Sequence, residues 1–298
     1  MSAVVEVKGL TKRYGDTTVL NAIDFTLKEG KIYGLLGRNG AGKTTIMHML
    51  AAQLFPTKGT VKVFGENPYE NKRVLDRICF IKESQRYPET FKVSDVLGVA
   101  ETLFPNWDRR YAENLLEQFD LPRNRPVKKL SRGMTSSVGI IVGLASRAPL
   151  TIFDEPYLGL DAVARSMFYE LLLEDYANHP RTVILSTHLI DEVSQLLEHV
   201  IVIDKGEILF DEEADTLRDK GYTVAGPAGK VNSFVGDKEV VSSSALGGFS
   251  TATVIGVSAG EKEEAEKLGL DIVPVSLQEL IVHLTGKRKR QTEGGFGA

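Results

Sequence analysis

The spacing of apolar residues along the chain alternates between the period of strands and the period of helices, and it predicts where these elements lie. Short apolar or alternating runs bounded by turn residues predict strands. They span 3–9, 18–28, 31–36, 59–65, 150–154, 182–186 and 200–204, and residues 71–82 predict a helix followed by a strand that ends near Ile81. Helical spacing predicts helices over 44–54, 161–177 and 189–198. The alternation predicts an α/β fold with a mainly parallel sheet, after an N-terminal antiparallel β region.

Residues of about 88–148 break this alternation, because their apolar positions follow helical spacing only. Polar residues that cap helices mark three starts. The expected helices run from the cap Ser94-Asp95 to Phe104, from Asp108 to Phe119 and from Ser131 to Ala145. We therefore expect a helical insert within the α/β layer.

Beyond about Asp211, glycine and serine become frequent and the pattern changes again. Six short segments predict a β-α-β-β-α-β order, which suits a small ferredoxin-like α+β unit over 211–286. The segments are 222–225, 230–235, 239–245, 250–257, 262–268 and 271–275, followed by a helix from Leu277 to Leu284. Residues 287–298 predict a flexible tail, and its basic run Lys287–Arg290 favours a solvated end over a contact with lipid or nucleic acid.

Composition narrows the class of protein. A length of 298 residues suggests about two domains, and 42% apolar residues favour a folded core. The net charge of −4 argues against a nucleic-acid partner. The single cysteine, Cys79, lies in a strand-like run and fits a buried position in a protein of the reducing cytosol. No apolar run approaches the ~18 residues of a membrane span, so we expect any action at a membrane to pass through a partner.

Candidate chemistry begins with the segment Gly37-Arg-Asn-Gly-Ala-Gly-Lys-Thr44, which has the form G-x-x-x-x-G-K-T. Gly37, Gly40 and Gly42 allow successive backbone N–H groups to face one anion. Lys43 brings a positive charge to the outer phosphates, and the Thr44 hydroxyl can ligate Mg²⁺. A chance glycine turn is the alternative, but the strand before it and the helix after it favour a phosphate site.

Acidic residues end a later strand, where Leu150–Phe153 leads into Asp154 and Glu155. Ligands of open α/β sheets bind at the carboxyl ends of strands, so we expect both acids near the phosphate site. Asp154 is then a partner of Thr44 at Mg²⁺, and Glu155 can orient the attacking water. His188 follows the next strand and can reach the terminal phosphate. The alternatives are a strand-ending turn for the acids and a polar strand cap for the histidine.

Together with two further segments, these motifs resemble the nucleotide-binding subunit of an ATP-binding-cassette (ABC) transporter over about residues 3–210. The motifs are the phosphate loop (Gly37–Thr45), the signature segment (Leu130–Met134), the acid strand (Ile152–Glu155), the dimer loop (Leu158–Asp161) and the switch His188. The resemblance implies a cassette over 1–210 that contains the helical insert. It also implies that Asn39, Ala41 and Thr45 contact the nucleotide with the rest of the phosphate loop.

The resemblance further implies a mechanism. Two such subunits face head to tail, and Ser131 and Gly133 of one touch the γ-phosphate held by the other. Asp161 crosses the interface, and Tyr14 stacks on adenine; a packed aromatic under the first hairpin is the alternative for Tyr14. ATP closes the pair, hydrolysis reopens it, and a separate membrane-spanning permease receives the motion. The subunit is then expected at the cytoplasmic face of the cell membrane, and the pair can be identical or mixed.

The sequence departs from the family's pattern at two places. The usual signature is Leu-Ser-Gly-Gly-Gln, whereas Arg132 and Met134 stand at its third and fifth positions here. Arg132 can bind phosphate or slow turnover. The usual glutamine after the strand that ends near Ile81 is also absent. We favour Glu83 as the contact on the metal or water side, with Gln85 as its rival.

The favoured interpretation is an ATPase subunit of an exporter, with ATP and Mg²⁺ bound. The ending Ser276–Gly286 resembles the tail of export-type subunits. One alternative is a regulatory ABC ATPase that hydrolyses weakly; another is a soluble ABC ATPase that acts on the ribosome or DNA. In the family, the insert carries the groove for the permease. Its candidate lining is Tyr87, Phe91, Leu103, Phe104 and Trp107, which otherwise form the insert's own core.

Overall fold

The computed structural model describes residues 2–83, 85–255 and 259–283. The chain forms two compact units, which we describe separately. The first comprises the described residues of Met1–Leu189 and Leu196–Asp211, and the second those of Ile190–Gln195 and Glu212–Ala298. The predicted tail 287–298, its basic run and Leu284 lie outside the described residues.

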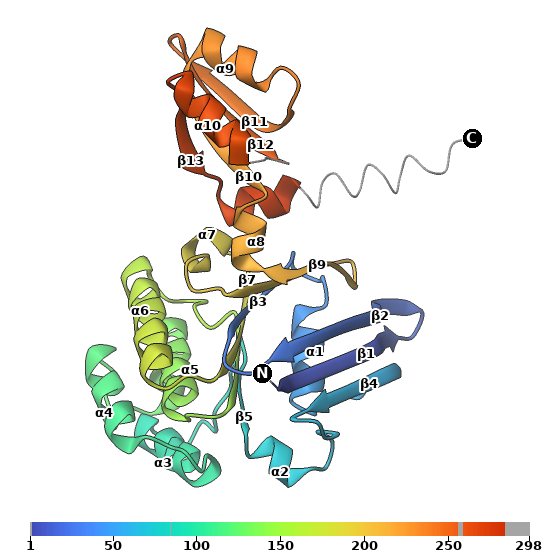
Figure 1. Ribbon diagram of the computed structural model, residues 1–298. Helices are drawn as coiled ribbons and strands as arrows, with labels where there is room; N and C mark the ends of the chain where they lie inside the picture. Colours follow the sequence, from blue (N-terminus) through green and yellow to red (C-terminus); the bar gives the residue numbers. More distant parts are fainter. Residues whose placement is uncertain (1, 84, 256–258, 284–298) are drawn as a thin grey trace. The chain divides into compact units, whose positions relative to one another are not determined.

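An antiparallel sheet of order β2-β1-β4 opens the first unit (Figure 1). Its strands are β1 (Ala3–Tyr14), β2 (Thr17–Lys28) and β4 (Lys58–Val63). Val7 of β1 lies opposite Phe25 of β2 and Val61 of β4, and all three side chains are buried on one face. Alternation of apolar and polar residues therefore places one face against the core. The predicted antiparallel region is confirmed, and β1 runs five residues beyond its predicted end at residue 9.

A six-stranded sheet of order β5-β6-β7-β3-β8-β9 forms the centre of the first unit. It contains β3 (Ile32–Leu36), β5 (Ile78–Ile81), β6 (Leu150–Asp154), β7 (Thr182–Thr187), β8 (His199–Asp204) and β9 (Glu207–Glu213). The pairs β5-β6, β6-β7, β7-β3 and β3-β8 are parallel. β3 and β6 are buried throughout, as expected for strands covered on both faces.

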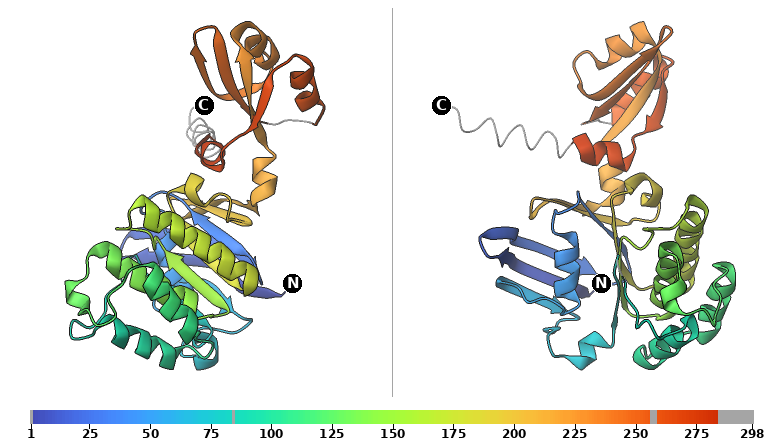
Figure 2. Two further views of the ribbon diagram at one scale, coloured as in Figure 1. Left: turned by 90° about the vertical axis from the view of Figure 1, so that its left-hand side faces the viewer. Right: turned by 180° about the vertical axis from the view of Figure 1, so that it is seen from behind.

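Helices cover the two faces of this sheet (Figure 2). Helix α1 (Lys43–Leu50) lies between the two sheets, and α5 (Arg132–Ala145) and α6 (Ala162–Asn178) lie on the opposite face. The short α2 (Lys72–Leu75) precedes β5. The prediction of a helix to residue 54 was too long, because Ala52 adopts a left-handed backbone (φ 54°) that ends α1.

The helix predicted over 189–198 is also shorter in the structure, where α7 covers Ile190–Val193. By Glu198 the backbone has joined the sheet, because its N–H donates to the carbonyl of Ile32. Across the described parts of the chain, we find no helix with the length and apolar character needed to cross a membrane.

The helical insert consists of α3 (Val93–Leu103), α4 (Arg109–Gln118), a 3₁₀ turn (Val127–Lys129) and α5. Asp108 and Ser131 cap α4 and α5 as predicted, accepting from the N–H groups of Tyr111 and Met134. Ser94-Asp95 was the wrong cap for α3, which begins at Val93. Asp95 lies in the first turn instead and accepts from the N–H of Lys92 at 2.8 Å.

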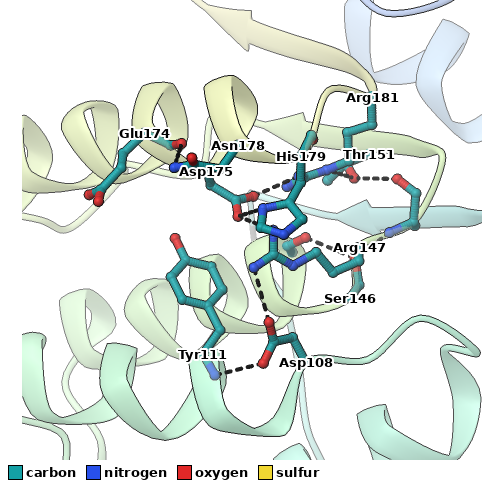
Figure 3. Close-up of polar contacts among 12 residues, drawn as sticks. Asp108, Tyr111, Ser146, Arg147, Thr151, Glu174, Asp175, Asn178, His179 and Arg181 are labelled. Atoms are coloured by element: carbon teal, nitrogen blue, oxygen red, sulfur yellow. Dashed lines mark hydrogen bonds and ion pairs between the residues drawn. The ribbon is translucent and has the colours of Figure 1, made fainter.

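A polar cluster ties this insert to the rest of the first unit (Figure 3). The buried carboxylate of Asp175 in α6 contacts Arg147 at 2.5 Å and Arg181 at 2.6 Å. Arg147 follows α5 and also reaches Asp108, the cap of α4, at 3.1 Å. Two helices of the insert therefore share one ionic anchor with α6.

The second unit has the predicted β-α-β-β-α-β order. Its elements are α8 (Ala214–Arg218), β10 (Gly221–Pro227), α9 (Ala228–Val235), β11 (Glu239–Leu246), β12 (Phe249–Ile255), α10 (Ala259–Lys267) and β13 (Asp271–Pro274), and residues 277–283 are helical. The antiparallel sheet has the order β11-β12-β10-β13, and its core includes Tyr222 and Phe234. This order is that of a ferredoxin-like unit.

Candidate functional site

The phosphate loop connects β3 to α1, at the carboxyl end of the parallel sheet. Gly37, Gly40 and Gly42 have φ values of 156°, 80° and 114°, which side chains disfavour. A Cβ atom at Gly37 would lie 2.2 Å from the carbonyl oxygen of Ile203. Only glycine fits this turn, which gives the amide-lined geometry that a phosphate group needs.

Lys43 lies in the first turn of α1 and is buried. Its Nζ donates to the carbonyl of Gly37 at 2.8 Å and to that of Arg38 at 3.4 Å. Glu155 Oε1 is 3.8 Å from the same ammonium group. The Lys43 side chain is thus folded back over the phosphate loop. A bound anion would take the place of these carbonyl and carboxylate oxygens next to the ammonium group.

Thr44 and Asp154 meet although they are far apart in sequence. The Thr44 hydroxyl donates to Asp154 Oδ2 at 2.8 Å. Oδ1 of the same carboxylate is buried without a hydrogen-bond partner among the described residues. Burial raises the pKa of Asp154, against the hydrogen bond from Thr44 that lowers it. A hydroxyl and a carboxylate with a spare oxygen form a hard oxygen donor set that fits Mg²⁺.

Glu155 and His188 also come together. His188 Nδ1 is 2.8 Å from Glu155 Oε2. Glu155 is buried and adopts a left-handed backbone (φ 47°) directly after β6, whereas the His188 side chain is 43% exposed. The carboxylate therefore lies between the switch histidine on one oxygen and Lys43 on the other.

Tyr157 is a member of this group that sequence reasoning missed. Its phenol contacts Glu155, Thr187 and His188, and the residue is only 1% exposed. Nothing in the local pattern distinguishes it from a core aromatic, because its partners on β7 and beyond are 30 or 31 residues away.

The signature segment and the dimer loop pack against each other within one chain. A Cβ atom at Gly133 would lie 2.5 Å from the carbonyl oxygen of Gly159, and the Ser136 hydroxyl donates to the Leu158 carbonyl at 2.6 Å. Ser131 caps α5, and Asp161 caps α6 by accepting from the N–H of Ala164 at 2.9 Å. The structure brings these residues to helix N-termini, where backbone N–H groups favour anions.

Tyr14 ends β1 and is 51% exposed, with Lys12 Nζ 4.9 Å from its ring centroid. This exposure is at odds with the alternative of a packed aromatic. The Tyr14 side chain is thus open to solvent, with the Lys12 ammonium over its ring.

Glu83 and Arg132, the two departures from the family's pattern, form an ion pair at 3.5 Å. Both side chains are largely exposed, at 48% and 67%. Glu83 and Arg132 line a cavity of about 210 Å³. Gln85 lines it too, together with Arg86 and Ser136. Both candidates for the position of the usual glutamine thus face the signature segment.

Four of the five predicted groove residues line one cavity of about 380 Å³ beside α3, namely Tyr87, Phe91, Leu103 and Phe104. Trp107 does not line this cavity. It lines a second hollow with Asn106 and Arg147, because the turn after Phe104 carries it toward the end of α5.

Comparison with known proteins identifies the family of the chain. A family profile described as "ABC transporter" matches residues 20–158. The chain is 34% identical to the bacitracin transport ATP-binding protein BcrA of Enterococcus faecalis, covering 75% of this chain and 74% of that protein. It is 22% identical to the ABC transporter ATP-binding protein YtrB of Bacillus subtilis (strain 168), covering 96% and 100%. A solved structure of the ATP-binding subunit of an ABC transporter superposes with a TM-score of 0.66 at 25% identity, over 72% of this chain and 92% of that one.

The fold and the phosphate loop define a P-loop ATPase cassette. The chain belongs to the ABC transporter family and is an ATP-binding subunit with ATPase activity. Such subunits dimerise and work with permease partners in the membrane.

Proposed function

We propose that this subunit powers export across the cell membrane by ATP-driven closure of a pair of cassettes. The observation that supports this proposal most directly is the convergence of Lys43, Asp154, Glu155 and His188 from three separate segments around the phosphate loop. Export is the favoured direction, because one relative of the chain is named for Nod factor export; others are named for bacitracin transport and lantibiotic transport.

Each residue has a proposed part in hydrolysis. The amides of Gly37–Thr45, which include Asn39, Ala41 and Thr45, hold the phosphates with the Lys43 ammonium. Thr44 and Asp154 would hold Mg²⁺, which when bound would neutralise charge on the phosphate oxygens. Glu155 accepts a proton from the attacking water. His188 contacts Glu155 through Nδ1, and its Nε2 is left to contact the terminal phosphate.

A second cassette completes the site. Ser131 and Gly133 of one subunit contact the γ-phosphate on the other, Asp161 crosses the interface, and Tyr14 stacks on adenine. The exposed face of Tyr14 and the helix N-terminus beside Ser131 support these roles. Glu83 is the favoured metal-side contact, and it must leave Arg132 to act. The second subunit is identical or a related chain.

The remaining assignments concern organisation. Residues 1–210 form the cassette, 211–286 an accessory unit and 287–298 a tail. The cassette pair acts at the cytoplasmic face through a separate permease, without nucleic acid. The apolar cavity beside α3, lined by Tyr87, Phe91 and Leu103, suits a helix of that permease.

Steady-state hydrolysis by the wild type and Glu155→Gln tests the chemistry. We expect the substitution to lower kcat by about 10²-fold or more and to leave ATP binding intact, because it removes the base but little volume. Glu117→Gln, an exposed residue of α4, is the matched control and should retain full activity. A wild-type rate no higher than that of Glu155→Gln would instead favour a regulatory protein that holds ATP.

Purification from native membranes tests the partner. We expect a polytopic membrane protein to co-purify in stoichiometric amount. Recovery of ribosomes or DNA in its place would contradict the proposed transport role and favour the soluble alternative.

A further inference from the structure

The hydroxyl of Tyr157 lies among groups from two strand ends. It is within bonding distance of Glu155 Oε2, of Thr187 Oγ1 at 2.9 Å, of the His188 backbone nitrogen at 3.2 Å and of His188 Nδ1 at 3.1 Å. A phenol has one proton to donate and two lone pairs. Four neighbours therefore exceed what it can bond, and the donors must be assigned.

One assignment satisfies the strongest contacts. The hydroxyl donates to Glu155 Oε2, since a carboxylate only accepts. It accepts from Thr187 Oγ1 and from the backbone N–H of His188. His188 Nδ1 then donates to Glu155 Oε2, which at 2.8 Å is the nearer of its two neighbours. Thr187 keeps its own acceptor role toward the N–H of Leu189 at 2.9 Å.

This assignment treats the two oxygens of Glu155 differently. Oε2 receives both donors, the phenol and the imidazole. Oε1 receives no hydrogen bond from the described residues and lies 3.8 Å from Lys43 Nζ. The oxygen left available is thus the one on the side of the phosphate loop, where a proton acceptor for the attacking water is needed.

We infer that Tyr157 is a positioning residue for ATP hydrolysis. It holds the Glu155 and His188 side chains in a fixed arrangement, so that Glu155 Oε1 faces the terminal phosphate. This inference rests on the proposed role of Glu155. The phenol acts by donating a hydrogen bond and does not touch the nucleotide.

Two further observations support a neutral, fixed donor. Burial, and then the hydrogen bond to Glu155, raise the pKa of Tyr157, so the hydroxyl keeps its proton throughout the working pH range. The ring is buried and lies 5.8 Å from the His188 ring, centroid to centroid, so the side chain is held by packing as well as by hydrogen bonds.

Tyr157→Phe removes the hydroxyl and keeps the ring. We expect kcat for ATP to fall by about tenfold, the effect of losing one hydrogen bond to a charged group, while KM changes by less than about twofold. Tyr222→Phe is the matched control, because Tyr222 is equally buried and its hydroxyl makes no hydrogen bond among the described residues. It should retain wild-type kcat.

A double mutant separates positioning from general damage. If Tyr157 acts through Glu155, adding Tyr157→Phe to Glu155→Gln should slow hydrolysis no further. A structural role would multiply the two losses and lower the melting temperature. Thr187→Val, which removes a donor to the same phenol, should lower kcat by about threefold and serves if Tyr157→Phe does not fold.

Wild-type kcat in Tyr157→Phe or in Thr187→Val, or multiplied losses in the double mutant, would overturn the inference. If Glu155→Gln is slow and Tyr157→Phe is not, only the positioning role of Tyr157 is contradicted, and the proposed function stands. If Glu155→Gln itself hydrolyses at the wild-type rate, the proposed function fails first and takes the inference with it.

Discussion

At the scale of single residues, charge pairs in this molecule differ mainly in their exposure. Glu83 and Arg132 meet in solvent, whereas Asp175 is 1% exposed between two arginines. Solvent screens the first pair and leaves the second largely unscreened. The exposed pair is therefore expected to be weak, and the buried cluster is suited to hold elements in place.

A double-mutant cycle on Glu83→Gln and Arg132→Gln measures the exposed pair. We expect a coupling free energy of unfolding below about 1 kcal/mol that disappears at high salt. Denaturant unfolding at two ionic strengths provides the measurement. A coupling of several kcal/mol that survives salt would mean that the two departures form a rigid lock.

The buried cluster gives the opposite expectation. Asp175→Asn leaves Arg147 and Arg181 without their shared carboxylate, so the free energy of unfolding should fall by about 3 kcal/mol or more. Glu113→Gln, which removes an exposed partner of Arg123, should cost less than about 1 kcal/mol. Equal effects of the two substitutions in urea would show that the cluster is not an anchor.

At the scale of elements, α5 connects the signature segment to the ionic anchor. Its N-terminus packs on the dimer loop through Gly133 and Gly159, and Arg147 follows its C-terminus. One continuous helix therefore connects the dimer loop to the ionic anchor.

Gly133→Ala tests the packed end of α5. The added Cβ would lie 2.5 Å from the Gly159 carbonyl oxygen, so we expect a loss of about 1–3 kcal/mol in stability together with lower ATPase activity. Gly98→Ala is the matched control in α3, where an added Cβ meets open space. It should stabilise the protein by up to about 1 kcal/mol. Thermal unfolding of both variants measures these changes in stability. A Gly133→Ala variant as stable as the wild type would contradict tight packing between Gly133 and Gly159.

Some elements could be predicted from the sequence because their cause is local. The phosphate loop needs φ values that only glycine adopts readily, and Asp108 and Ser131 cap their own helices. Other features depend on distant partners. The contact of Tyr157 with Thr187, the pairing of Glu83 with Arg132 and the early end of the helix before Glu198 each join segments far apart in the chain. No local pattern encodes such contacts.

At the scale of the whole molecule, the candidate chemistry belongs to one unit. Every predicted site residue, from Tyr14 to His188, lies in the first unit. The second unit is a separate ferredoxin-like sheet with its own core, and the relative YtrB is matched along almost the whole chain. We therefore assign nucleotide binding to the first unit. We expect the second unit to modify ATP hydrolysis or to connect it to a partner.

The central claim is that the phosphate loop binds ATP through its amides and the Lys43 ammonium, with Mg²⁺ held by neighbouring oxygens. Calorimetric titration of the full chain with ATP, with and without Mg²⁺, tests it most directly. We predict magnesium-dependent binding that weakens at least about tenfold in Lys43→Ala, whereas the exposed Lys62→Ala binds like the wild type. Binding that ignores magnesium, or that is undiminished in Lys43→Ala, would contradict the account.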